Sequence, residues 1–298
     1  MASSKTTILM YGRTNSGKTA QIGELAEYVF KTTGKKTRLY TADRGGTITI
    51  APHISLGLVE AVEMGSQDPW IFLNKAVRGY VKDEKGKWVP GNNANIGLFA
   101  FESLRSFAES LMASMAEKAG QNVNIGGGSN VSFSINADGE SLKISGSNMA
   151  HFGVAQSRIT EEVWQSQRLD APYILWTSSV SKDEDTTAAG KILGPDVIGK
   201  ALTAEVPRWF NLTFRLDVIP AQQGKPERHL LYLGNHVDAG AGNASGLGNT
   251  RLPLDAPKLE KNIIEPASLV AALQLIDRGR EAAIKAINER LKKEDPRP

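Results

Sequence analysis

A glycine-rich segment near the N-terminus has the residue types and spacing to bind phosphate. It matches the pattern G-x-x-x-x-G-K-[ST] and reads Gly12-Arg13-Thr14-Asn15-Ser16-Gly17-Lys18-Thr19. The two glycines let the backbone turn tightly and approach an anion, and the N–H groups of the loop and of a following helix would point at phosphate. Lys18 would reach the β- and γ-phosphates, and the Thr19 hydroxyl would bind Mg²⁺. The motif therefore predicts a site for a nucleoside triphosphate with Mg²⁺; the alternative is a glycine turn that holds no ligand.

An acidic residue at the end of a buried strand is the second chemical signal. The apolar run at residues 96–101 is followed by Glu102 and Ser103. Where a phosphate loop is present, such an acid lies beside it and holds the magnesium through water. The alternative role is an acid in the first turn of the next helix, where the helix dipole favours it. Both roles are compatible, and we assign Glu102, together with Thr19, to the metal.

A second carboxylate and a group of hydroxyls follow two other predicted strands. Asp43 comes directly after residues 37–42 and before Gly45-Gly46. At that edge of the sheet, its carboxylate would orient and deprotonate the attacking water; the alternative is an Asx turn that starts the glycine loop. Another strand ends in Trp176-Thr177-Ser178-Ser179. These hydroxyls would contact the γ-phosphate or place the water, or would merely cap the strand end.

The elements that must position these residues alternate between strands and helices over the first half of the chain. We expect strands at residues 6–11, 37–42 and 96–101, and helices at 18–33 and 103–119, from continuous apolar runs and from apolar spacings of three and four. Helices are also expected at 56–64 and 69–77, and residues 82–93 are expected to form an exposed loop. This alternation predicts an α/β fold with a mostly parallel, helix-covered sheet.

The second half of the chain adds antiparallel features. Two alternating runs within residues 120–150 predict an inserted β-hairpin. A helix is expected at 152–169, strands at 173–177, 210–218 and 229–233, and loops at 181–199 and 238–249. The later alternating strands predict an antiparallel extension at one edge of the sheet. We divide the chain into a core at residues 1–265 and a C-terminal helix at 266–298.

Composition excludes several classes of protein. The 298 residues are 41% hydrophobic, which is enough apolar material to exclude disorder as the dominant state. There is no cysteine, which excludes disulfide scaffolds, thiolate metal sites and cysteine nucleophiles. No apolar run is long enough for a transmembrane helix and no secretory signal is present, so we expect a cytoplasmic protein without a membrane partner. The net charge of +3 permits nucleic-acid binding without arguing for it.

The order of these motifs resembles the RecA-like P-loop ATPases. Within them, the chain is most similar to phage single-strand-annealing and recombination ATPases and related phage nucleotide-binding proteins. Further support comes from three segments, which are Gly194-Pro195-Asp196-Val197-Ile198-Gly199-Lys200-Ala201-Leu202, Arg208-Trp209-Phe210 and Phe214-Arg215-Leu216-Asp217.

The resemblance implies an ATPase that binds ATP and Mg²⁺, assembles as a homo-oligomer and acts on DNA, single-stranded by preference. It implies that Glu102 is the magnesium-associated acid and that Asp43 activates water. It places Lys200 and Arg208 where the family supplies a cation to a neighbouring subunit's nucleotide. The family loops that contact DNA correspond here to residues 120–150, where an oligomerisation hairpin is the alternative, and to residues 181–199.

Two residues depart from the family pattern. The family usually has Asp at the position of Glu102 and Glu at the position of Asp43, and a shorter carboxylate at position 43 reaches water less far. Two other functions therefore stay open. One is a phage DNA-packaging or translocation ATPase that needs double-stranded DNA. The other is a nucleotide-binding assembly protein with little turnover.

Overall fold

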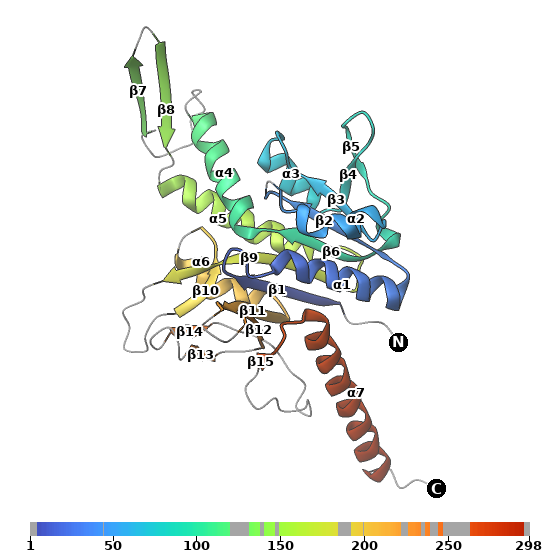
Figure 1. The fold of residues 1–298 in the computed structure, drawn as a ribbon. Coiled ribbons are helices and arrows are strands. Elements are labelled where there is room, and N and C mark those ends of the chain that lie inside the picture. The colour runs from blue at the N-terminus through green and yellow to red at the C-terminus, as the bar shows by residue number, and fades with distance from the viewer. Residues whose placement is uncertain are drawn as a thin grey trace.

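A central sheet of 11 strands organises the part of the chain that the computed structural model describes. The described residues are 5–43, 45–119, 131–137, 140–146, 149–183, 192–198, 200–221, 226–233, 236–238, 244–246 and 263–294. Figure 1 shows this sheet crossing the middle of the molecule, with helices above and below it.

The parallel part of the sheet contains the strands that carry the predicted site. Strand β1 (Thr6–Gly12) lies between β9 (Tyr173–Asp183) and β11 (Leu212–Ile219) and is parallel to both. On the side away from β1, the first half of β9 pairs with β6 (Ile96–Glu102). Strand β6 pairs with β2 (Lys36–Thr41), and β2 pairs with β3 (Val59–Glu63). Strand β9 therefore separates the strand of the phosphate loop from the strand that ends at Glu102.

Antiparallel strands extend this parallel core. At one edge, β12 (Arg228–Tyr232) pairs with β11, and β15 (Ile263–Ile264) pairs with β12. Beyond the end of β6, β10 (Ile192–Asp196) pairs with the second half of β9, and β14 (Ala244–Gly246) and β13 (His236–Asp238) follow. The predicted architecture, an α/β core with a mostly parallel, helix-covered sheet and an antiparallel edge extension, is confirmed. The loops predicted at 181–199 and 238–249 were too long, because each contains one of these short strands.

Helices cover both faces of the sheet. One face carries α1 (Lys18–Thr33) and the first turns of α7 (Leu269–Glu294), whose buried apolar side chains form one cluster with those of β1 and β11. The other face carries α3 (Pro69–Ala76), α4 (Leu104–Ala119), α5 (Met149–Ser166) and α6 (Lys200–Glu205), which share a second cluster. A short helix, α2 (Ala51–Ser55), follows a 3-10 turn at Ile48–Ile50.

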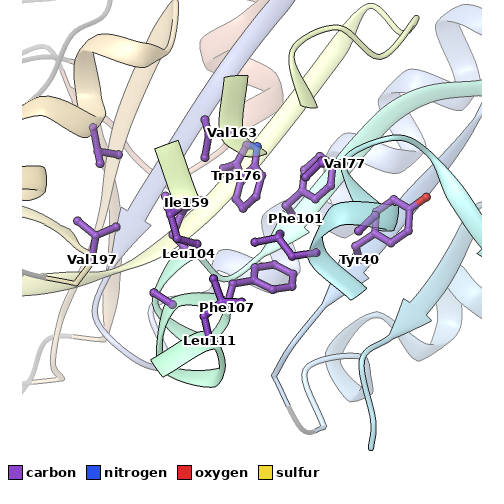
Figure 2. Close-up of a cluster of buried hydrophobic side chains, with 14 of the residues drawn as sticks. Tyr40, Val77, Phe101, Leu104, Phe107, Leu111, Ile159, Val163, Trp176 and Val197 are labelled. Atoms are coloured by element: carbon purple, nitrogen blue, oxygen red, sulfur yellow. The ribbon is translucent and has the colours of Figure 1, made fainter. Parts of the chain in front are cut away.

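A row of aromatic side chains holds β2, β6 and β9 in register. Tyr40 stacks on Phe101 with ring centroids 5.5 Å apart, and Phe101 stacks on Trp176 at 4.4 Å. Phe107 of α4 meets Trp176 edge-on, as Figure 2 shows. Stacked aromatic rings contribute about 0.5–1.5 kcal/mol per pair beyond the area they bury. Each ring on a strand lies one residue before Thr41, Glu102 or Thr177, so the row aligns these three neighbouring residues of β2, β6 and β9.

Two β-hairpins project from the core (Figure 1). The predicted inserted hairpin is confirmed as β7 (Val131–Ala137) and β8 (Glu140–Gly146), which pair antiparallel between α4 and α5. The predicted loop at residues 82–93 was wrong in part, because β4 (Tyr80–Lys82) and β5 (Trp88–Pro90) form a second hairpin. A cation–π contact between Lys82 and Trp88 joins its two strands, with Nζ 5.6 Å from the ring centroid.

The helix predicted at residues 56–64 was wrong. Gly57 has φ +71°, which interrupts a helix, and residues 59–63 pair in parallel with β2 as the edge strand β3. Leu, Glu, Ala and Met favour a helix intrinsically, and the backbone hydrogen bonds offered by the free edge of β2 outweigh that preference.

The C-terminal helix α7 is buried at its start and exposed further along. Leu269, Leu273 and Ile276 are buried, whereas Ile284 and Ile287 are 53% and 48% exposed. Figure 1 shows α7 projecting beyond the core. The division of the chain at residue 265 stays a prediction. Among the described residues, none of the helices combines the length and the apolar character needed to cross a membrane.

Candidate nucleotide site

The predicted phosphate loop lies between β1 and α1, as its sequence pattern requires. Gly12 ends β1, and Gly17 immediately precedes α1 with φ +93°. A Cβ at Gly12 would lie 2.3 Å from the carbonyl oxygen of Leu216 and 2.7 Å from Ser16 Oγ, so no larger residue fits there. Asn15 also has a positive φ, of 62°. The loop thus turns tightly and lines a cavity of about 420 Å³ at the N-terminus of α1.

Lys18 closes the loop from the helix side. Its Nζ donates hydrogen bonds to the carbonyl oxygens of Gly12, at 3.0 Å, and Arg13, at 2.8 Å. Burial lowers the pKa of Lys18, while the nearby carboxylates of Glu102 and Asp43 act in the opposite direction. An ammonium group placed over the loop and facing the cavity is positioned to pair with phosphate oxygens.

Thr19 and Glu102 meet at the floor of the same cavity. Thr19 Oγ1 donates a 2.5 Å hydrogen bond to Glu102 Oε1. Glu102 is 3% exposed, and burial raises its pKa to about 7; the Thr19 hydrogen bond lowers the pKa, Asp43 raises it and Lys18 lowers it. Its second oxygen, Oε2, has no hydrogen-bond partner among the described residues. An unpartnered buried carboxylate oxygen beside a hydroxyl fits Mg²⁺, which prefers oxygen ligands.

Asp43 lines the cavity together with Glu102, from the turn that follows β2. Its backbone N–H donates to Thr41 Oγ1 at 3.0 Å, and its carboxylate accepts a hydrogen bond from the hydroxyl of Ser106 in α4. Gly46 lies between the two acids: a Cβ there would be 3.3 Å from Asp43 Cβ and 3.3 Å from Glu102 Oε2. The structure therefore brings both predicted carboxylates to the phosphate loop.

The hydroxyls at the end of β9 divide between the cavity and the core. Ser179 pairs with Gly12 in the sheet and lines the cavity. Ser178 is buried and donates to the carbonyl oxygen of Asp196 at 2.7 Å, and Thr177 is also buried. Because β9 lies between β1 and β6, Ser179 stands between the phosphate loop and the strand of Glu102.

Lys200 and Arg208 come from a different part of the fold. Lys200 is the first residue of α6, and Arg208 lies exposed in a 3-10 turn at Val206–Trp209, before β11. Strand β11 begins opposite Ile8, whereas the phosphate loop follows Gly12, about 13 Å further along β1. Arg208 therefore lies near the amino-terminal ends of β1 and β11, whereas the phosphate loop follows the carboxyl-terminal end of β1.

The sequence patterns did not identify two residues of the site, Ser106 and Gly46. Ser106 holds Asp43, and Gly46 leaves room between the acids. A usable signal for Ser106 was the spacing Ser103-x-x-Ser106 at the start of a predicted helix, which is the spacing of a capping pair. For Gly46 the sequence offered only the pair Gly45-Gly46, with nothing that distinguished the second glycine from the first.

The segments expected to contact DNA lie partly outside the described residues. In the 120–150 insertion, residues 120–130, 138–139 and 147–148 are outside, and so are residues 184–191 and 199 in the second segment. The described parts are β7, β8 and residues 149–150 in the first segment, and residues 181–183 and 192–198, which include β10, in the second.

Solved structures match this chain, whereas protein-family models and curated proteins do not. No protein-family model matches this chain. No curated protein matches it either. Among solved structures, a KaiC-like protein from the hyperthermophilic archaeon Pyrococcus horikoshii matches with a TM-score of 0.43 and 11% sequence identity, over 76% of this chain and 78% of that chain. A likeness of this size carries no argument about activity.

Proposed function

We propose that this chain is an ATPase that binds ATP with Mg²⁺ at the phosphate loop, assembles as a homo-oligomer and acts on single-stranded DNA in annealing or recombination. The observation that carries nucleotide binding is the convergence of Lys18, Thr19 and Glu102 on one cavity at the N-terminus of α1. The support for DNA and for assembly is the resemblance in the order of motifs along the chain.

Each residue of the cavity has a role in the proposed hydrolysis. The loop N–H groups and Lys18 bind the phosphates, and Thr19 and Glu102 hold the metal, which when bound neutralises charge on the β- and γ-phosphates. Asp43 accepts a proton from a water molecule whose oxygen attacks the γ-phosphorus. The bond between that phosphorus and the β–γ bridging oxygen breaks, which yields ADP and phosphate. A cation from a neighbouring subunit, Arg208 or Lys200, stabilises the developing charge, a contribution of about 10³–10⁵ in rate.

A second function is favoured by the two carboxylates themselves. Asp43 is short for a water-activating acid, and Glu102 stands where the family that the chain resembles usually has the shorter Asp. Both features favour slow turnover, and they fit a protein whose assembly is stabilised by bound ATP.

The test is ATP turnover and particle size, measured for the wild type and for Lys18→Ala, without DNA and with single- or double-stranded DNA. We expect turnover that single-stranded DNA stimulates and that Lys18→Ala abolishes. Equal turnover in both proteins would overturn the site. Stimulation by double-stranded DNA alone would favour a packaging or translocation ATPase. ATP-dependent assembly with negligible turnover would favour the assembly protein.

A further inference from the structure

Two serines, at positions 103 and 106, lie at the start of α4. Ser103 immediately precedes the helix, and its Oγ accepts a 3.2 Å hydrogen bond from the backbone N–H of Ser106. This is the bond of an N-cap residue. The N-cap role thus belongs to Ser103, and it leaves the hydroxyl of Ser106 free for another partner.

That partner is the carboxylate of Asp43. Ser106 Oγ lies 3.0 Å from Ser103 Oγ and within hydrogen-bond distance of Asp43 Oδ1. A serine hydroxyl has one proton, and an ionised carboxylate only accepts. The proton of Ser106 must therefore point to Asp43, and the proton of Ser103 must point to Ser106. The chain of donors runs in one direction, from Ser103 through Ser106 to Asp43 Oδ1.

This direction divides the work between the two carboxylate oxygens of Asp43. Oδ1 already accepts a hydrogen bond from Ser106, which lowers its basicity, so Oδ2 is the better acceptor for a proton from water. Ser103 and Asp43 line the cavity, whereas Ser106 is not among the residues that line it. Ser106 thus contacts Asp43 without standing where the nucleotide and water would bind.

We propose that Ser106 is a positioning residue, which fixes the rotamer of Asp43 so that Oδ2 faces the attacking water. The inference rests on the proposed hydrolysis. It also explains how a short carboxylate can act at position 43: the hydrogen bond from α4 restricts its motion, and restricted orientation is worth a large factor in rate because small displacements of a reacting group are costly.

The experiment measures kcat and KM for ATP, together with direct nucleotide binding, in a set of serine variants. In Ser106→Ala we expect kcat to fall about tenfold while KM and nucleotide affinity stay within twofold of wild type. Ser106→Thr keeps a hydroxyl and should recover most of the rate. Ser114→Ala removes a buried serine two turns further along α4 and serves as the matched control, with an unchanged kcat.

A double variant separates positioning from a general loss of structure. If Ser106 acts through Asp43, then adding Ser106→Ala to Asp43→Asn should slow hydrolysis no further, because the effects of residues that act as one unit are not additive. A further tenfold loss in the double variant would overturn the proposal, and so would a wild-type kcat in Ser106→Ala. If the wild type shows no more turnover than Lys18→Ala, the proposed function itself fails, and this inference fails with it.

Discussion

Thr19 and Glu102, which are 83 residues apart in the chain, are joined by a 2.5 Å hydrogen bond from Oγ1 to Oε1. The bond ties the first turn of α1 to the end of β6 at the floor of the cavity. It also leaves Glu102 Oε2 without a partner among the described residues. One buried carboxylate thus has one oxygen bonded to α1, and its other oxygen is the one that would bind the Mg²⁺ of the proposed function.

Replacing Thr19 by Val should separate metal binding from phosphate binding. The side chain keeps its shape and loses its hydroxyl, so affinity for ATP with Mg²⁺ should fall about tenfold, because the metal loses one oxygen ligand. Affinity for ATP without Mg²⁺ should change little. Titration calorimetry with and without Mg²⁺ measures both. Thr19→Ser is the control and should bind as the wild type does; an undiminished Mg²⁺ effect in the Val variant would contradict this role.

The raised pKa of Glu102 predicts that stability depends on pH when neither nucleotide nor metal is present. Between pH 4.5, the ordinary pKa of the side chain, and about pH 7, the folded state holds a proton that the unfolded state has released. The free energy of unfolding therefore falls as the pH rises through this window and is constant above it. The contribution is up to about 3 kcal/mol.

Glu102→Gln isolates this contribution, because the amide does not ionise. The variant should be more stable than the wild type at pH 8 by about 1–3 kcal/mol, with a smaller difference at pH 5. Urea unfolding at the two pH values provides the measurement. A difference in stability that is the same at pH 5 and pH 8 would show that Glu102 ionises normally in the folded protein.

Two glycines predict opposite effects of the same substitution. Gly12→Ala should destabilise the fold by about 1–3 kcal/mol, because its Cβ would meet the backbone carbonyl of Leu216. Gly153→Ala should stabilise it by about 1 kcal/mol, because Gly153 is exposed within α5 and a Cβ there would have no atom within 4 Å. Unfolding midpoints in urea compare the two. If the unfolding midpoint of Gly12→Ala rose as that of Gly153→Ala does, β1 and β11 would have adjusted to the methyl group at position 12.

Arg208 should act on the nucleotide of a neighbouring subunit. It lies at the amino-terminal end of β11, whereas the phosphate loop of the same subunit lies at the carboxyl-terminal end of β1. We expect Arg208→Ala to bind ATP normally and to hydrolyse it slowly. Mixing it with Lys18→Ala should restore part of the activity, because in a random mixture about a quarter of the interfaces pair an intact Lys18 with an intact Arg208. The same mixture made with Lys200→Ala tests the other candidate. No recovery in either mixture would exclude both residues from a role between subunits.

Local patterns were enough to predict the elements around the phosphate loop. The loop, the strand before it and the helix after it follow from glycine positions and from a stripe of apolar residues with helical spacing. Strand β6 and helix α4 were predicted for the same reason. Such features depend on interactions between residues near each other in the chain.

Other features depend on partners distant in the chain, and local patterns did not predict them. Residues 59–63 form a strand because β2 offers a free edge. The role of Ser106 depends on Asp43, 63 residues away, and the room left by Gly46 depends on Glu102. The placement of β10 beside the far half of β9 likewise follows from sheet pairing.

Strand β9 has a consequence for how the cavity can change. Its backbone pairs with Gly12 at Ser179 and with Phe101 at Trp176, so the four residues 176–179 span the distance between the loop after β1 and the strand that ends at Glu102. An inserted or deleted residue between Trp176 and Ser179 would turn Ser179 to the opposite face of the sheet and shift both neighbours at once. The distance between the two halves of the cavity is therefore determined by the length of this short segment, whatever the composition of the surrounding loops.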